Sequence, residues 1–236
     1  MGFDHTRLRT ASATITEAKS SYAVGEELAR QVNDASLRHV FVVSDGLNVN
    51  GSDLARGLAS GVSEGVSITG GLSGDGANFR ETWVIDPEAA GPQRVAAVGL
   101  YGDHLRVGYA SMGGWKPFGP VRTITRAEGN VLYELDGQSA LDLYKTYLGE
   151  HAAQLPASGL LFPIVVSQDQ GGEGVVRTVL SVDEAEKSMT FAGDIPQGGT
   201  AQFMKTNVDD LVDGATEAAE TSLTGLATGD RTWRFW

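Results

Sequence analysis

Residues 39–62, HVFVVSDGLNVNGSDLARGLASGV, limit the possible folds of this chain more than any other stretch. Val40–Val43 is a short apolar run rich in β-branched side chains, which is typical of a buried strand. Ser52 or Asp53 can then cap a helix whose apolar positions are Leu54, Leu58 and Val62. Val66–Ile68 is predicted to be a second strand, parallel to the first because a helix connects the two.

The pattern changes after residue 76. Short runs with strand character alternate with turns that contain glycine and aspartate, and Gly102-Asp103 is predicted to form a hairpin turn. Residues 113–130, GGWKPFGPVRTITRAEGN, are predicted to be a loop that leads into another strand, because glycine and proline interrupt any helix there. The strands predicted in this region are Thr82–Ile85, Arg94–Tyr101 and His104–Met112.

A domain boundary is predicted at Asp136-Gly137, which gives domains of residues 1–137 and 138–236. Ser139 can cap a helix, SALDLYKTYLGEH, that has one apolar face, and a last helix is predicted over Val208–Ala219. Strands are predicted between these helices at Leu160–Val166, Gly174–Val182 and Ser188–Ala192. The fold class is therefore α/β of the mixed α+β kind: a parallel strand–helix start, then antiparallel strands, then a second helix-plus-sheet portion.

Composition excludes several function classes. The chain has 30 acidic and 18 basic residues, so its formal net charge is 18 − 30 = −12, and such a surface repels nucleic acid. It has no cysteine, so disulfides, thiolate nucleophiles and cysteine metal sites are excluded. The polar N-terminus is not a signal peptide, and no apolar run approaches the roughly 18 residues of a membrane span. We therefore expect a cytoplasmic protein.

Residues suited to catalysis or metal binding are sparse. The four histidines, His5, His39, His104 and His151, are far apart in sequence, and none has the spacing of a metal site. Residues 61–65 match G-x-S-x-G around Ser63, but a nucleophile elbow needs a strand before the serine and a helix after it, and the order here is reversed. We predict no catalytic residue, no metal and no cofactor. A hydrolase that uses Ser63, or Asp45 with Asp75, remains the alternative.

The glycine-rich run GGLSGDG, residues 70–76, follows the second predicted strand. Its spacing matches neither common phosphate loop, but open α/β sheets bind ligands beyond the carboxyl ends of their strands. A purely structural turn explains the glycines about equally well. The ligand-binding residues predicted at this edge are Ser44, Asp45, Gly70, Gly71, Ser73, Gly74 and Asp75.

Two further ligand-binding residues are predicted outside this edge. Trp115 lies with Phe118 in a segment flanked by glycine and proline, where aromatic side chains often serve binding. Trp115 can equally be a core side chain beneath its loop. Arg177 can pair with a ligand carboxylate, although surface ion pairing is the commoner role of an arginine.

A series of motifs in fixed order resembles the FIST family, whose FIST N and FIST C domains are sensory domains of signal-transduction proteins. The resemblance covers residues 20–220, and its motifs include Asp45-Gly46, Gly70-Gly71, Gly74-Asp75, Thr82, Gly114-Trp115, Glu134–Gly137, Pro163 and Arg177. It implies a small ligand, with amino acids suggested for the family, and signalling partners such as histidine kinases, cyclic-di-GMP modules or chemotaxis proteins. It implies no catalytic mechanism.

The chain departs from the family pattern at both ends. An early strand–helix portion and a later strand of the FIST C domain have no counterpart, so the comparison predicts a FIST N-like domain without its first part, a partial FIST C-like domain and open sheet edges. The tail contains Trp233, Phe235 and Trp236. The function predicted is an intracellular sensory module that binds a small ligand and relays the event. The alternative is a scaffold whose acidic faces bind a signalling partner.

Overall fold

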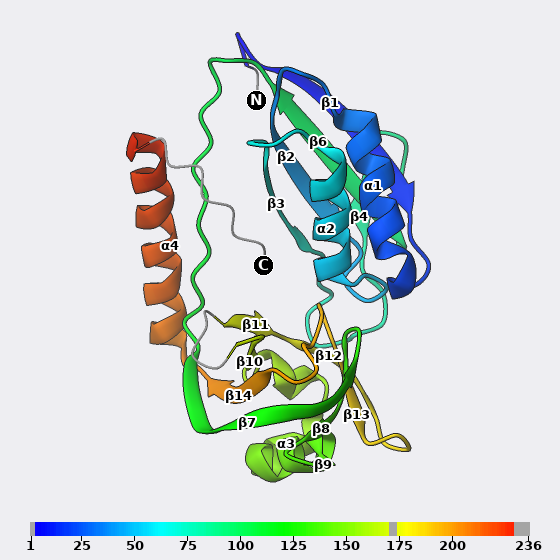
Figure 1. The fold of residues 1–236 in the computed structure, drawn as a ribbon, viewed down its shortest axis with the longest axis vertical. Coiled ribbons are helices and arrows are strands. Elements are labelled where there is room, and N and C mark those ends of the chain that lie inside the picture. The colour runs from blue at the N-terminus through cyan, green and yellow to red at the C-terminus, as the bar shows by residue number, and fades with distance from the viewer. Residues whose placement is uncertain (1–2, 170–173, 229–236) are drawn as a thin grey trace. The chain divides into compact units, whose positions relative to one another are not determined.

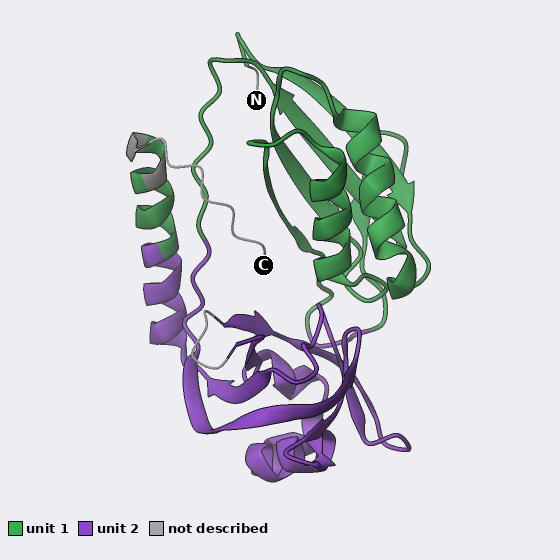
Figure 2. Cartoon of the chain, in the orientation of Figure 1, with its two compact units in different colours: residues 1–76, 80–110, 218–235 green, residues 77–79, 111–217, 236 purple. Residues whose placement is uncertain are grey.

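The computed structural model describes residues 3–169 and 174–228, so the tail residues Trp233, Phe235 and Trp236 lie outside the described part. The chain forms two compact units (Figure 2). Unit 1 contains residues 1–76, 80–110 and 218–235, and unit 2 contains residues 77–79, 111–217 and 236.

Unit 1 contains a mixed four-stranded sheet in the order β1-β6-β2-β3 (Figure 1). Its strands are β1 (Arg7–Thr14), β2 (Leu37–Ser44), β3 (Ser67–Leu72) and β6 (Arg94–Tyr101). β2 and β3 are parallel, as predicted, and the α-helix between them provides the crossover. β6 is antiparallel to both of its neighbours, β1 and β2. A short pair, β4 (Val84–Ile85) and β5 (Ala90–Gly91), lies before β6.

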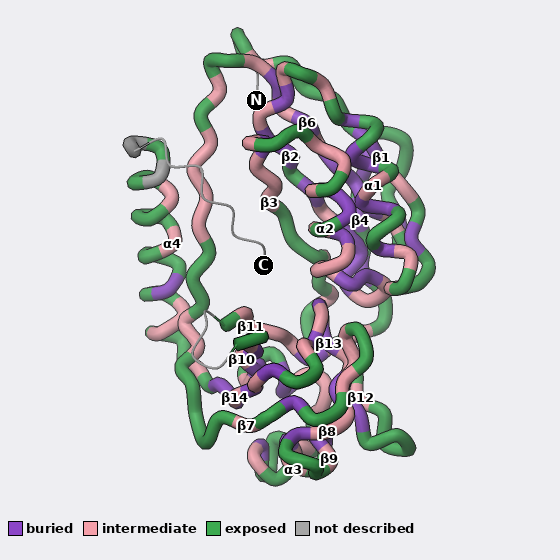
Figure 3. Tube along the Cα trace, viewed as in Figure 1, coloured by how far each residue is buried: buried purple, intermediate pink, exposed green. Residues whose placement is uncertain are grey.

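Two helices, α1 (Ser21–Val32) and α2 (Gly51–Gly61), pack side by side in unit 1 (Figure 1). Glycines allow their backbones to touch: a Cβ added to Gly57 would lie 2.1 Å from the Tyr22 carbonyl oxygen. Asn50 caps α2, since its side chain accepts hydrogen bonds from the amides of Ser52 and Asp53. The buried residues of the helices and the central strands form one core (Figure 3), which includes Val24, Leu28, Val32, Val40, Val42, Leu54, Leu58, Val95 and Ala97.

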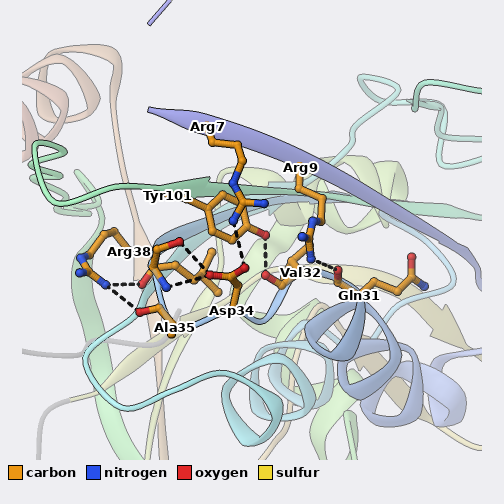
Figure 4. Close-up of polar contacts among 10 residues, drawn as sticks. Arg7, Arg9, Gln31, Val32, Asp34, Ala35, Arg38 and Tyr101 are labelled. Atoms are coloured by element: carbon orange, nitrogen blue, oxygen red, sulfur yellow. Dashed lines mark hydrogen bonds and ion pairs between the residues drawn. The ribbon is translucent and has the colours of Figure 1, made fainter. Parts of the chain in front are cut away.

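Side chains from β1 and β6 surround the C-terminal end of α1 (Figure 4). The Tyr101 hydroxyl donates to the Val32 carbonyl, and the Arg7 guanidinium lies 4.3 Å from the Tyr101 ring centroid. Arg7 also donates to Asp34 at 3.0 Å. Hydrogen bonds from Ser36, and the nearby Arg7, lower the Asp34 pKa from 3.8 to about 2. The charged groups here are therefore paired within the chain.

Unit 2 contains an antiparallel sheet in the order β11-β10-β14-β7-β8-β13-β12, with β9 paired to β8. Its strands are β7 (Lys116–Glu128), β8 (Val131–Leu135), β9 (Gln138–Ser139), β10 (Ile164–Ser167), β11 (Val175–Arg177), β12 (Val179–Asp183), β13 (Ser188–Phe191) and β14 (Thr200–Lys205). The strand predicted over Gly174–Val182 is thus two strands, and β7 occupies much of the predicted loop 113–130.

Helix α3 (Ala140–Leu148) begins after Ser139, whose hydroxyl accepts a hydrogen bond from the Asp142 amide at 3.1 Å, as predicted. Short 3-10 helices lie before α1 (η1, Ala18–Ser20) and after α3 (η2, Gly149–Gln154, and η3, Ala157–Leu160). Aromatic rings stack between α3 and the sheet, with centroids 4.7 Å apart for Tyr147 and Phe203. The core of unit 2 is apolar and includes Ile124, Leu132, Leu135, Leu141, Tyr144, Ile164, Val179, Met189 and Phe191.

Two predictions for the segment between β6 and β7 are wrong. His104–Met112 is not a strand, and Gly102-Asp103 is not a hairpin turn. Both edges of β6 are already occupied by β1 and β2, so no edge remains for a hairpin partner. The segment contacts the last helix instead: a Cβ on Gly108 would lie 2.1 Å from the Ser222 carbonyl oxygen, and one on Gly114 would lie 2.0 Å from that of Asp210.

The last helix, α4 (Val208–Thr228), is nine residues longer than the predicted Val208–Ala219, since it ends at residue 228 rather than 219. Within the described residues, no helix combines the length and the apolar character that a membrane crossing requires. The mixed α+β fold class that the sequence predicts is confirmed.

Candidate ligand site

The turn after β2 is held by the carboxylate of Asp45. This side chain is buried, with 1% of its surface exposed. Its Oδ1 accepts hydrogen bonds from the amides of Leu47 (2.8 Å) and Asn48 (2.7 Å) and from Asn48 Nδ2 (3.1 Å), and its Oδ2 accepts from the Gln93 amide (3.1 Å). Asp45 therefore fixes the backbone of the turn and joins it to the chain just before β6.

The end of β2 touches the glycine-rich segment directly. The Ser73 amide donates to the Ser44 carbonyl at 2.8 Å, and the Gly46 amide donates to Thr82 Oγ1 at 2.8 Å. A Cβ on Gly46 would lie 1.9 Å from the Ser73 carbonyl oxygen, so only glycine fits there. The structure thus brings together Ser44, Asp45 and Ser73, which the sequence predicts for one site.

The glycine-rich segment has two parts. Gly70 and Gly71 belong to β3, and a Cβ on Gly70 would lie 1.8 Å from the Val42 carbonyl oxygen. Gly74 and Gly76 lie in the loop beyond β3, where an added Cβ would meet nothing within 4 Å. The loop therefore has an open backbone on a closely packed strand.

The side chains of Asp75 and Ser73 in this loop differ in their hydrogen bonding. Asp75 Oδ2 accepts hydrogen bonds from the amides of Arg80 (2.8 Å) and Glu81 (3.2 Å), so this carboxylate shapes the loop. Ser73 is half-buried, and within the part of the chain that the structure describes its hydroxyl makes no hydrogen bond. The Ser73 hydroxyl therefore has spare bonding capacity at this edge.

The other two predicted residues belong to unit 2. The Arg177 Nε donates to the Asp194 carbonyl at 2.9 Å, and burial lowers the pKa of its guanidinium. Trp115 immediately precedes β7 and is half-buried against Gly113. Its indole N–H is buried and finds no acceptor among the described residues. A buried donor without a partner is uncommon in proteins and is usually satisfied by water or a ligand.

Sequence reasoning did not single out a polar cluster on β2 and β3. His39 is 5% exposed, and its ring nitrogens lie 2.6 Å from Ser67 Oγ and 2.9 Å from Thr69 Oγ1. Burial lowers the His39 pKa from 6.5 to about 4, so the imidazole is neutral near pH 7. Without a carboxylate partner this histidine is a weak general base for Ser67. Side chains two residues apart in a strand lie on the same sheet face. This spacing of Ser67 and Thr69, beside His39 on the neighbouring strand, is the signal that could have indicated the cluster.

The catalytic alternative finds little support in the geometry. Ser63 lies between α2 and β3, as the sequence predicts, and its hydroxyl is 3.4 Å from Asn33 Oδ1. Asp45 and Asp75 are both engaged by backbone amides. Among residues 3–169 and 174–228, no group of three or more histidine, aspartate or glutamate side chains is arranged to hold a metal ion.

Comparison with known proteins gives one clear result. The family model described as FIST N domain matches residues 1–138, and the one described as FIST C domain matches residues 140–229. No curated protein and no solved structure matches the chain. The domain boundary at residue 137 remains a prediction, since the compact units divide the chain at other positions.

Proposed function

This chain belongs to the FIST family of sensory domains in signal transduction, and we propose that it binds a small polar metabolite and relays that event to a signalling partner. Amino acids are the first ligand class to test. The site begins at the edge formed by the carboxyl ends of β2 and β3. In unit 2, Trp115 and Arg177 are proposed separately as ligand-binding residues.

One observation supports this proposal above all: two parallel strands end beside a glycine-rich loop that hydrogen bonds within the chain hold in place. Asp45 and Thr82 anchor the β2 turn, while Gly74 and Gly76 leave the loop backbone open. Ligands of open α/β sheets bind at such strand ends, and a pre-organised loop loses little entropy on binding. The Ser73 hydroxyl can donate to or accept from a polar ligand group.

The ligand chemistry follows from the groups available. Backbone amides and a serine hydroxyl suit a carboxylate or a carbonyl oxygen, and backbone carbonyls suit an ammonium group. In unit 2 the Trp115 indole N–H is a donor only, so it would bind an acceptor group of a ligand there. A free amino acid carries both kinds of group, which makes it a better match than a purely apolar molecule.

The relay is proposed to act through a shift between conformations that bind the ligand with different affinity. A histidine kinase, a cyclic-di-GMP module or a chemotaxis protein would receive the signal in the cytoplasm. No catalytic step is part of this proposal. An acidic scaffold that binds its partner without a small ligand is the second candidate, and the exposed α4 carboxylates at positions 209, 213, 217 and 220 favour it.

A thermal-shift screen of the purified chain against single amino acids and other small metabolites tests the proposal. Binding to the native state at 100 times the dissociation constant stabilises it by about 2.7 kcal/mol. Ser73→Ala should weaken a selective shift without harming the loop, because alanine keeps the backbone amide and carbonyl through which Ser73 contacts Ser44 and Gly46. Trp115→Phe removes the unpaired N–H and keeps an aromatic ring.

Trp83→Phe is the matched control, because the Trp83 N–H already donates to Glu81 at 2.6 Å and the side chain is exposed. It should leave the ligand shift unchanged. A cooperative melt that no metabolite shifts would instead favour the scaffold. A shift that Ser73→Ala and Trp115→Phe both leave intact would place the ligand elsewhere.

A further inference from the structure

Strand β3 is an outer strand of the unit 1 sheet and pairs with β2 alone (Figure 1). The Ser73 amide donates to the Ser44 carbonyl, and backbone groups alternate in direction along a strand. The β3 residues whose amides and carbonyls point away from β2 are therefore Ile68, Gly70 and Leu72. Within the part of the chain that the structure describes, no strand pairs with this outer edge. It presents a row of hydrogen-bonding groups that an added strand can use.

The other edge strands of the two larger sheets have features that hinder strand addition. β1 carries exposed Arg7 and Arg9, and charged side chains on an edge discourage pairing. β11 has only three residues, and β12 has an irregular register after Val179 and ends at Asp183. β3 has six residues in regular register with β2, and it contains no charge, no proline and no bulge. Among the described edges, β3 is therefore the one suited to pairing.

The side chains of β3 leave room for an added strand. Gly70 and Gly71 are exposed, and a Cβ on Gly71 would meet nothing within 4 Å. Leu72 is 40% exposed, so a large apolar side chain is available to a partner. Ile68 packs against the core of unit 1, which holds β3 in place. The edge thus offers backbone hydrogen bonds and an apolar contact on a strand that is already anchored.

Charge indicates which strand fits this edge. No lysine or arginine lies in residues 57–79, and the carboxylates of Glu64 and Asp75 lie in the connections just before and just after β3. An antiparallel pair of two copies centred on Gly70 would bring Glu64 of each copy near Asp75 of the other, and neighbouring like charges are destabilising. A strand with basic residues at its ends is instead attracted by both carboxylates. The edge therefore favours a basic partner over a second copy of this chain.

We infer that β3 binds an extended segment of a partner protein as a fifth strand of the unit 1 sheet. The segment has apolar side chains at alternate positions and lysine or arginine at its ends. Backbone hydrogen bonds to Ile68, Gly70 and Leu72 provide the affinity, and the side chains provide the selectivity. β3 ends one residue before Ser73, so the bound segment lies beside the proposed ligand edge. Its binding nevertheless requires no metabolite, so the two proposals can fail separately.

A fluorescent peptide tests this inference on the full chain without any metabolite. The probe consists of alternating valine and threonine residues with a lysine at each end, and both termini are blocked. Fluorescence anisotropy should give a dissociation constant of at most about 1 mM, and binding should weaken as salt rises from about 0.05 M to about 0.5 M. The matched control peptide has glutamate in place of both lysines and should bind at least about tenfold more weakly.

Substitutions in the chain identify the edge. Leu72→Pro removes an outer amide of β3 at a position where edge strands tolerate proline, and it should weaken peptide binding roughly fivefold to tenfold. Thr10→Pro is the matched control on β1: the Ile15 amide donates to the Gln93 carbonyl, so the Thr10 amide points away from β6, and binding should not change. Leu72→Lys keeps the backbone and adds a positive charge, so it should also weaken binding. Circular dichroism verifies that each variant is folded.

Hydrogen exchange locates the bound peptide residue by residue. Saturating peptide should slow the exchange of the Ile68, Gly70 and Leu72 amides at least about tenfold and leave the amides of β1 unchanged. The inference is wrong if no peptide binds at about 5 mM, if the lysine and glutamate peptides bind equally well, or if folded Leu72→Pro and Leu72→Lys both bind as wild type does. A wild-type dimer in sedimentation that Leu72→Pro converts to a monomer would mean that a second copy occupies the edge.

Discussion

Unit 1 buries seven polar or charged side chains, whereas unit 2 buries two, Ser158 and Ser188, among the residues the structure describes. The seven are Ser21, His39, Ser44, Asp45, Asn50, Thr82 and Asp86. Most of them organise turns and helix ends around β2, as Asp45 does with backbone amides of Leu47, Asn48 and Gln93. The core of unit 2 consists instead of aromatic and aliphatic side chains.

This difference matters because buried polar groups and apolar cores fix a structure in different ways. A hydrogen-bonded polar group specifies one backbone geometry and costs free energy when its partner is lost. An apolar core mainly supplies stability and tolerates small rearrangements. Buried hydrogen bonds thus fix the loops of unit 1, which suits the proposed ligand edge, whereas the core of unit 2 is mainly apolar.

The largest effect is expected from Phe191→Ala in unit 2. Phe191 is fully buried, and removing such a side chain leaves a cavity that typically costs about 3–5 kcal/mol. Phe41→Ala in unit 1 is the control, since Phe41 is 46% exposed, and it should cost less than about 1 kcal/mol. Urea unfolding measures both. Equal losses would contradict the view that packing dominates unit 2.

Acid should act on unit 1 through His39. The folded pKa of about 4 lies below the ordinary 6.5 because burial disfavours the imidazolium. As the pH falls below 6.5, the unfolded chain takes up a proton that the folded chain does not, so the free energy of unfolding decreases until about pH 4. The loss is on the order of 3 kcal/mol.

The measurement is urea unfolding of wild type and His39→Gln between pH 7.5 and 4. The glutamine variant keeps a polar side chain near Ser67 and Thr69 but does not titrate. Its stability should fall less over this range, and the difference between the two proteins is the contribution of His39. Parallel pH profiles would mean that His39 is not protected from protonation in the folded state.

A smaller effect is expected from Asp45→Asn. The asparagine side chain can still accept hydrogen bonds through its one oxygen. Its NH₂ group would face the Gln93 backbone amide, so two buried donors would meet without an acceptor between them. A loss of about 2 kcal/mol follows. Asp183→Asn in unit 2 is the control, because Asp183 also accepts backbone amides, from Ala185 and Glu186, but is exposed. If both substitutions cost the same, the burial of Asp45 contributes nothing.

Local sequence patterns predict much of this fold. The strand at Val40–Val43, the helix after it and the parallel strand at Val66–Ile68 are all confirmed, because their signals lie within a few residues of one another. The bounds of β6 agree with the prediction Arg94–Tyr101. The sequence also indicates the contact between Ser44 and Ser73, because parallel neighbours end at the same edge.

Long-range pairing accounts for what the sequence does not predict. No element is predicted for residues 7–32, where β1 and α1 lie. β1 pairs with β6 from far along the chain, whereas α1 has a local signal that was available, the i, i+4, i+8 spacing of Val24, Leu28 and Val32. His104–Met112 has strand-like composition, but β6 has no free edge to pair with it. Likewise the Gln93 amide that reaches Asp45 comes from 48 residues away. Whether the predicted ligand residues bind a ligand stays a prediction.

The strand order of unit 1 has a consequence for synthesis on the ribosome. β6 lies between β1 and β2, yet it is the last of the four strands to be translated. Until residue 101 has left the exit tunnel, β1 has no partner and one edge of β2 stays open. At about 5–20 residues per second this interval lasts several seconds, during which a chaperone, or a neighbouring nascent chain, can bind that edge.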